Sequence, residues 1–234
     1  MPDFFPGFLP VLAADTPVPW IAIWPYAAIV LAYLVGSIPF GYLIAMLVKK
    51  IDIREHGSGN IGATNVGRVL GAKWGILALV LDIVKALLPA CLFPMLLPAD
   101  SIWRPHLPVA CGVAAIIGHM YPCYLYLRGG KGVASALGVV AFLSPICTAG
   151  AFAVFVLSFL IWRIVSLSSI CAASAFAVSH FCLFRNQLWT AEGWSLTAFS
   201  IAIPTLIILR HRANIGRLMR GEEPRFTAGK KGEK

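Results

Sequence analysis

The residues best suited to do chemistry begin with a polar, glycine-rich stretch between positions 54 and 68. Its small, amide and charged members are Gly57, Ser58, Gly59, Asn60, Gly62, Thr64, Asn65 and Arg68. Glycine lets a backbone approach a ligand and aim successive N–H groups at one point, while hydroxyl and amide side chains add donors. The stretch offers no apolar face to a core, so we expect a ligand, rather than packing, to order it. Phosphate fits these donors, and a flexible polar connector is the alternative.

A second basic and glycine-rich stretch reads Arg128-Gly129-Gly130-Lys131-Gly132. A lysine on a short glycine turn that leads into the N-terminus of a helix is well placed to hold an anion. The alternative is a positively charged turn whose glycines only break the helix.

Two nucleotide-binding motifs are excluded. The first stretch satisfies G-x-G-x-x-G at Gly57, Gly59 and Gly62, but an apolar helical run precedes it and no βαβ unit is expected. In the second stretch position 125 is leucine and valine follows the Lys-Gly pair, which does not match a Walker A loop.

The third candidate lies near the C-terminus. His211, Asn214 and Arg217 are spaced i, i+3 and i+6, so on a helix they fall near one face and could converge on one ligand. A basic juxtamembrane segment attracted to anionic lipid headgroups is the alternative.

Other polar residues lie inside apolar segments. Asp82 and Lys85, three residues apart, should neutralise each other, in either a functional or a structural role. For His119 we favour a satisfied helix-interior histidine over a catalytic one. We interpret the six scattered cysteines as small core residues rather than as zinc ligands or disulfides.

The composition excludes a soluble protein. Of 234 residues, 59% are hydrophobic and 12% are charged, against about 25% charged in soluble domains. Four uncharged stretches, at 16–48, 105–127, 132–162 and 164–184, reach or exceed the roughly 20 residues that cross a bilayer. The sequence therefore predicts an all-α polytopic membrane protein. The net charge of +9 would suggest nucleic acid in a soluble chain, but here it reflects topology, and we expect no nucleic-acid partner.

The distribution of basic residues predicts the topology. The tail 210–234 and the loop 49–73 are both rich in Lys and Arg, so both should be cytoplasmic. An even number of crossings must separate them, which requires 132–162 to form two helices meeting at Ser144-Pro145. Seven spans result, with the N-terminus outside and the C-terminus cytoplasmic. Their expected positions are about 25–48 with a kink at Pro39, 72–97, 106–126, two within 132–162, 166–184 and 193–209.

We therefore divide the chain into an N-terminal periplasmic or extracellular extension (1–24), a seven-helix domain (25–220) and a basic cytoplasmic tail (221–234). No lysine or arginine precedes Lys49, so no cleavable signal is expected.

The motifs, taken in order, resemble the bacterial acyl-phosphate-dependent glycerol-3-phosphate acyltransferases of the PlsY type. They are GSIPFG at 36–41, REHGSGNIGATNVGR at 54–68, GHMYP at 118–122 with GGKGVA at 129–134, SLSS at 166–169, and HRANIGRL at 211–218 with GEE at 221–223. The resemblance implies transfer of a fatty acyl group from long-chain acyl phosphate to the sn-1 hydroxyl of glycerol 3-phosphate, giving lysophosphatidic acid and phosphate. It also implies no metal or cofactor, membrane lipid as a partner, and an active site on the cytoplasmic side of the bacterial inner membrane.

The resemblance also assigns residues. It implies catalytic roles for Ser58, Arg68, Lys131, His211 and Asn214. The donors and spacing described above, together with the resemblance, predict substrate or phosphate binding by Gly57, Gly59, Asn60, Gly62, Thr64, Asn65, Gly129, Gly130, Gly132, Arg217 and Glu223. The neighbouring Glu222 leaves the register of that glutamate open.

Two questions stay open at this point. The proton of the attacking hydroxyl could pass to His211 or to a substrate phosphate, while a covalent route through Ser58 lacks an evident His-Asp partner. A transporter of a phosphorylated metabolite is the rival function. It is disfavoured because the anion-binding candidates lie in loops at one edge and the unequal spans show no repeated halves.

Overall fold

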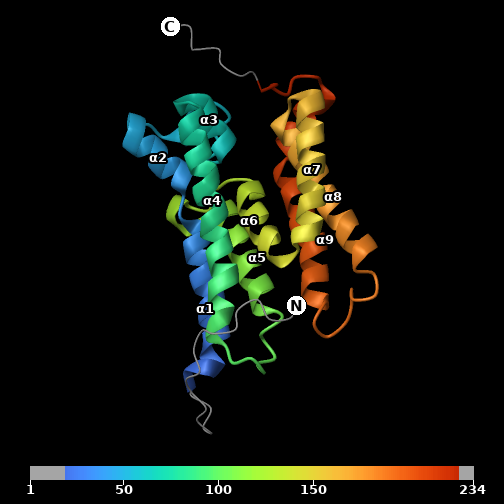
Figure 1. Ribbon diagram of the computed structural model, residues 1–234. Helices are drawn as coiled ribbons and strands as arrows, with labels where there is room; N and C mark the ends of the chain where they lie inside the picture. Colours follow the sequence, from blue (N-terminus) through green and yellow to red (C-terminus); the bar gives the residue numbers. More distant parts are fainter. Residues whose placement is uncertain (1–18, 227–234) are drawn as a thin grey trace.

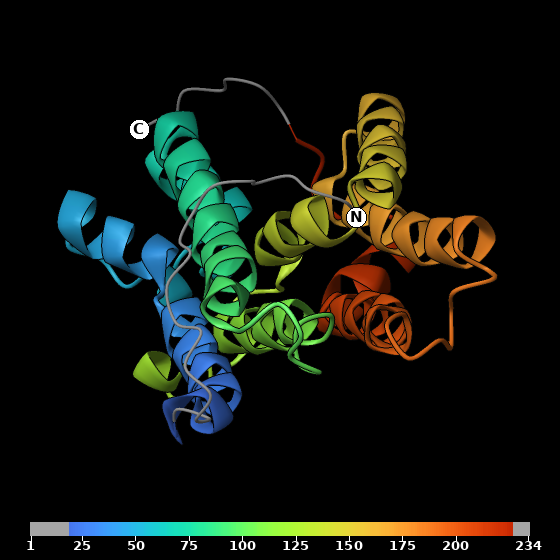
Figure 2. The ribbon, with the colours of Figure 1, turned by 60° about the horizontal axis from the view of Figure 1, so that its bottom comes forward.

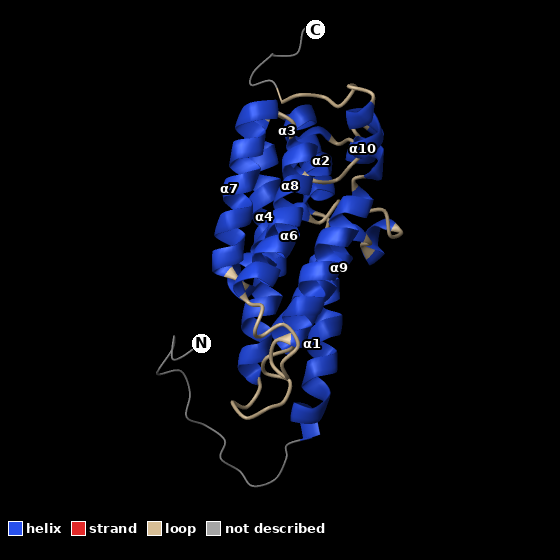
Figure 3. Cartoon of the chain, turned by 90° about the vertical axis from the view of Figure 1, so that its right-hand side faces the viewer, coloured by secondary structure: helices blue, strands red, loops and turns tan. Residues whose placement is uncertain are grey.

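A computed structural model describes residues 19–226, and within that range every regular element is helical (Figures 1 and 3). The α-helices are α1 (Pro19–Ser37), α2 (Phe40–Lys49), α3 (Ala63–Leu70), α4 (Ala72–Leu92), α5 (Leu107–Met120), α6 (Val133–Leu143), α7 (Pro145–Trp162), α8 (Val165–Leu183), α9 (Trp194–Arg210) and α10 (Arg212–Met219). Short 3₁₀ turns cover Ile53–Glu55, Phe93–Leu96 and Cys123–Leu125. The predicted all-α class is confirmed.

The helices form two groups joined through the middle of the chain (Figures 1 and 2). In the first, α4 packs against α1, α3 and α5, and α1 packs along α5. In the second, α8 packs against both α7 and α9. The short α6 contacts α4 and α5 on one side and α7 and α9 on the other, so it ties the two groups together.

Five helical segments are long and apolar enough to cross a membrane, and a sixth is added if α9 and the bent α10 are counted as one. The break within 132–162 is confirmed, because α6 ends at Leu143 and α7 begins at Pro145. At 11 residues, α6 is roughly 16 Å long at 1.5 Å per residue. It is therefore shorter than a full span.

Two of the connections between helices mark one end of the bundle, and three short helices mark the other (Figures 1 and 3). The α4–α5 and α8–α9 connections lie at the lower end in Figure 1. Helices α2, α3 and α10 lie at the upper end. The first and third candidate motifs therefore share an end of the molecule.

The first predicted span differs from the structure in two ways. Helix α1 begins at Pro19 rather than near 25, since proline is tolerated in a first turn, where its missing N–H costs nothing. The expected kink at Pro39 is a full interruption between α1 and α2, because a proline also drives the residue before it away from helical geometry. Residues 1–18 and 227–234 lie outside the described range, and so do most of the predicted extension and much of the tail.

The cysteine prediction is only partly right. Cys111 and Cys147 are buried in core clusters, but Cys123 and Cys182 are exposed on the outside of the bundle. A membrane helix also carries apolar side chains on its lipid-facing side, so apolar surroundings in the sequence do not identify the protein core.

Candidate active site

The first motif has an apolar core of its own, contrary to our expectation. Ile53, Ile61 and Val66 are buried and pack with residues of α2 and α4. The C-terminal part of the predicted loop is helix α3, which carries Thr64, Asn65 and Arg68. We missed this because the three apolar residues come from a 3₁₀ turn, a loop and a helix, and so show no periodic spacing.

Asn65 is the residue that organises this loop. Its side-chain oxygen accepts the Ser58 N–H at 2.8 Å, and its Nδ2 donates to the carbonyls of His56 and Asn60 at 3.0 and 2.9 Å. Asn60 in turn accepts the Gly62 N–H at 2.8 Å. The Asn65 amide and the Asn60 oxygen therefore hold the loop in its conformation.

Two glycines allow the turn that exposes Ser58. Gly57 and Gly59 have φ of +63° and +70°, values that favour glycine. A methyl group at Gly57 would also overlap the side-chain oxygen of Asn65. The turn leaves Ser58 exposed, and the side chains of Thr64 and Arg68 are exposed on α3 nearby.

The second motif is a tight turn fixed from two sides. The Gly130 N–H donates to the carbonyl of His119 at 3.0 Å. On the other side, Nη2 of Arg210 donates to the carbonyls of Gly129 and Gly130 at 3.0 and 2.8 Å. Gly132, with φ of +82°, then begins α6, which brings Lys131 to the N-terminal end of that helix.

Lys131 joins the second motif to the third. Its Nζ donates to Oδ1 of Asn214 at 2.5 Å, and Nδ2 of Asn214 donates to Glu223 at 2.5 Å. The carboxylate of Glu223 also accepts from the Ser166 hydroxyl at 2.6 Å and from Nε of Arg217 at 2.7 Å. Glu223 therefore belongs to this network. Its neighbour Glu222 pairs instead with Arg220 on the surface.

His211 lies at the junction of α9 and α10, with 2% of its surface exposed. Its Nδ1 is 2.8 Å from the carbonyl of Ile207. A carbonyl can only accept, so Nδ1 carries the hydrogen and Nε2 keeps its lone pair. Burial, and then the charge of Lys131, lower the pKa of His211 to about 4, so the ring is neutral at pH 7.

The network also shifts two other ionisable groups. Burial lowers the pKa of Lys131 to about 8; the Glu223 carboxylate opposes this shift, and the cations Arg217, Arg210 and Arg68 add to it. Burial opposes ionisation of Glu223, but hydrogen bonds from Ser166, Asn214 and Arg217 hold the pKa of its carboxyl below the usual value. At neutral pH the site therefore contains one carboxylate among several cations.

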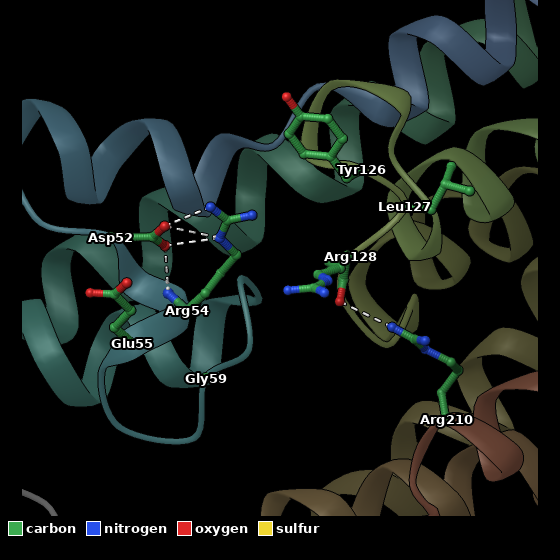
Figure 4. A pocket seen from close by; sticks show the side chains of 9 residues that line it. Asp52, Arg54, Glu55, Gly59, Tyr126, Leu127, Arg128 and Arg210 are labelled. Atoms are coloured by element: carbon green, nitrogen blue, oxygen red, sulfur yellow. Dashed lines mark hydrogen bonds and ion pairs between the residues drawn. The ribbon is translucent and has the colours of Figure 1, made fainter.

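A cavity of about 900 Å³ lies between the first motif, the second motif and Arg210, the residue before the third motif (Figure 4). Gly59 and Arg210 lie on opposite sides of it in Figure 4, and Gly129 also lines it. The remaining wall residues are Asp52, Arg54, Glu55, Tyr126, Leu127 and Arg128. Arg54 is held by Asp52 through an ion pair of 2.6 Å, and Arg128 and Arg210 bring further positive charge to the cavity.

The structure thus places the three predicted motifs around one basic region. Lys131, Asn214, Arg217 and Glu223 form a connected network, and Arg68 lies close enough to act on the charge of Lys131. Sequence reasoning missed Arg210 and Ser166. Arg210 was counted only as positive charge, and Ser166 appeared only as part of the resemblance. Within residues 19–226, no group of three His, Cys, Asp or Glu side chains is placed to hold a metal ion.

Comparison with known proteins defines the class of this helical bundle. The family model for glycerol-3-phosphate acyltransferase matches residues 26–221. Relatives of that name are found in Syntrophotalea carbinolica, at 44% identity over 87% of this chain and 98% of theirs, and in Aquifex aeolicus, at 46% identity over 85% and 97%. The chain belongs to the glycerol-3-phosphate acyltransferase family, as its motifs indicated.

Two solved structures show the same fold. They are crystal structures of PlsY (YgiH), described as an integral membrane glycerol 3-phosphate acyltransferase, in its glycerol 3-phosphate form and its lysophosphatidic acid form. Both are 41% identical to this chain, with TM-scores of 0.76 and 0.74. Each match covers 87% of this chain, with 96% and 95% of the respective PlsY chain.

Proposed function

We propose that the protein transfers a fatty acyl group from acyl phosphate to the sn-1 hydroxyl of glycerol 3-phosphate and releases lysophosphatidic acid and phosphate. The observation that carries this proposal is the Lys131–Asn214–Glu223 network, which joins two distant motifs beside the cavity of the first. The PlsY structures with glycerol 3-phosphate and lysophosphatidic acid support the identities of acceptor and product. Acyl phosphate as donor rests on the resemblance of the motifs.

In this proposal the cations hold two phosphates and the reacting groups between them. Arg68 and Lys131 neutralise the phosphate that leaves, while the exposed Ser58 and Thr64 donate to phosphate oxygens together with the N–H groups of Gly57, Gly59 and Gly62. Arg217 acts indirectly, by holding the carboxylate of Glu223. Asn65 acts by holding the loop, because both ends of its amide are already bonded, and the Asn60 oxygen is bonded to the Gly62 N–H. Since acyl phosphate is an activated donor, positioning supplies much of the catalysis.

The proton on the attacking hydroxyl passes to a substrate phosphate rather than to His211. With its pKa near 4, His211 is a weak base for an alcohol near neutral pH, whereas a phosphate monoester has a second pKa of about 6. His211 then serves mainly to hold the junction of α9 and α10. Asn214 and Glu223 orient Lys131 toward the leaving group.

The proposed setting is the bacterial inner membrane, with seven crossings and the active site facing the cytoplasm. The apolar helices and the integral-membrane relatives support a membrane protein. The excess of Lys and Arg at the motif-bearing end supports the orientation. For this count the short α6 is taken as a span, and its contacts with both helix groups support that interpretation.

Conversion of palmitoyl phosphate and glycerol 3-phosphate by the purified, detergent-solubilised protein tests the function. We expect lysophosphatidic acid and inorganic phosphate in equal amounts, and no product when palmitoyl coenzyme A replaces the donor. Absence of product under substrate saturation, with folded protein confirmed by size-exclusion chromatography, would contradict the assignment. Uptake of glycerol 3-phosphate into proteoliposomes without acylation would favour the transporter instead.

A further inference from the structure

Three ionisable side chains form a buried cluster between α4, α5 and the break that follows α1. Asp82, Lys85 and His119 are only 1%, 4% and 3% exposed. Asp82 and Lys85 form an ion pair of 2.7 Å, which confirms that they neutralise each other. Within a membrane-embedded bundle such a pair is costly unless it is well satisfied, and apolar residues would serve packing alone at least as well. The cluster therefore indicates a role other than packing.

Lys85 meets three polar groups, two of them through hydrogen bonds and Asp82 through an ion pair. Its Nζ lies 2.7 Å from Asp82, 2.7 Å from the carbonyl of Ile38 and 3.0 Å from Nδ1 of His119. An ammonium group can only donate, so Nδ1 of His119 accepts and Nε2 carries the hydrogen of the ring. The cluster thereby fixes the orientation of the His119 imidazole.

That imidazole supports the glycine turn of the second motif. A methyl group at Gly130 would overlap Nε2 of His119, so the backbone of the turn rests directly against the ring. The carbonyl of the same residue accepts the Gly130 N–H at 3.0 Å. The next residue along the chain is Lys131, whose ammonium reaches Asn214.

The far side of the turn is anchored to the same part of α4. On α6, the Ser135 hydroxyl donates to the carbonyl of Asp82 at 3.1 Å. One turn later, Gly138 lies so close to the carbonyl of Ile83 that a methyl group would overlap it. The chain is therefore held on both sides of Lys131 by the α4 segment that carries Asp82 and Lys85. On the N-terminal side the contact runs through His119, and on the C-terminal side it is direct.

We propose that Asp82, Lys85 and His119 are positioning residues that hold the Gly129–Gly130 turn and thereby place Lys131 against the substrate phosphate. The effect on catalysis rests on the proposed function, whereas the effect on the turn does not. His119 touches no reacting atom in this account and acts only through the turn.

The test compares His119→Ala with His180→Ala. His180 is a matched control, because it is equally buried at 3%, is bonded to Thr197 across α8 and α9, and belongs to neither the cluster nor the turn. Both variants lose one buried imidazole. We expect kcat/KM to fall about 100-fold in His119→Ala, the scale for displacement of a catalytic group by about 1 Å, and to stay near the wild-type value in His180→Ala.

Hydrogen–deuterium exchange of residues 127–134 provides a readout independent of activity. We expect faster exchange there in His119→Ala and no change in His180→Ala. Equal exchange in the two variants, or wild-type turnover in His119→Ala, would overturn the proposal. The turn could exchange faster in His119→Ala while the wild-type protein makes no lysophosphatidic acid. That result would contradict the proposed reaction and would still support the role of His119 in holding the turn.

Gly130→Ala keeps the proposal testable if His119→Ala does not fold. The φ of Gly130 is negative, so alanine is opposed there by the His119 ring rather than by backbone strain. We expect Gly130→Ala to lower kcat at temperatures at which the variant is still folded, although the added methyl group also costs some stability. Wild-type kcat in Gly130→Ala would overturn the proposal, because the turn would then tolerate displacement from His119.

Discussion

Lys131 lies between one carboxylate and several guanidinium groups, and this environment sets the ionisation of the site. Its folded pKa of about 8 is below the ordinary value of 10.5, chiefly because the side chain is partly buried. The Lys131 ammonium that binds phosphate is therefore protonated below pH 8 and loses its charge as the pH rises through that value. The sequence showed a lysine on a glycine turn, but it could not show this shift, which depends on burial by residues about 80 positions away.

We therefore predict an alkaline fall in kcat/KM centred near pH 8. The Glu223 carboxylate raises the pKa of Lys131, so Glu223→Gln should move the midpoint of this fall to lower pH. Initial rates between pH 6 and 10 measure both midpoints. An unchanged midpoint, or one moved upward, would show that Lys131 is not the titrating group.

Substitution of His211 distinguishes the two candidates for proton acceptor. If substrate phosphate is the base, His211→Ala should retain clearly more activity than Arg68→Ala, whose missing cation should cost about 100-fold or more in rate. Steady-state rates at saturating substrates, with the folded fraction checked by size-exclusion chromatography, make the comparison. Equal losses would count against the substrate phosphate as base.

At the scale of helices, α1 and α5 cross at close range. A methyl group on Gly118 would overlap the carbonyl of Tyr33, and one on Gly36 would overlap the backbone of Ala115. Small residues of this kind let two helix backbones approach closely within a membrane. Gly36 and Gly118 permit this approach, although the partner helix could not be read from the chain.

Gly118→Ala should therefore destabilise the bundle by about 1–3 kcal/mol, the usual cost of overpacking. Gly150 on α7 is the matched control, because the nearest atom to an added methyl there is 3.6 Å away. Thermal unfolding in detergent should show a lower midpoint for Gly118→Ala and little change for Gly150→Ala. Equal midpoints for the two variants would mean that the crossing is not as tight as the structure shows.

Helix prediction succeeded where apolar length decided the outcome and failed where three-dimensional packing did. The split of 132–162 followed from charge parity together with Ser144-Pro145, and it is confirmed. Helix α3 was missed, since Val66 is buried by residues far away in the chain. The partnership of Glu223 with Ser166 was likewise beyond the sequence, because 57 positions separate them.

At the scale of the whole molecule, the active site and the two lower connections should face opposite sides of the membrane. In a variant without the six native cysteines, Ser101→Cys on the α4–α5 connection should react with a membrane-impermeant maleimide in intact cells. Gly221→Cys should react only after permeabilisation. Labelling of both in intact cells would contradict the proposed orientation.

The central claim is that three segments distant in the sequence bind substrate phosphate in one shared site. A double-mutant cycle tests this claim most directly. Arg68→Ala and Lys131→Ala should each lower kcat/KM for glycerol 3-phosphate acylation by about 100-fold or more. If both cations act on the same phosphate, the double variant should lose far less than the product of the two losses. Losses that multiply would show that Arg68 and Lys131 act independently, and would contradict the shared site.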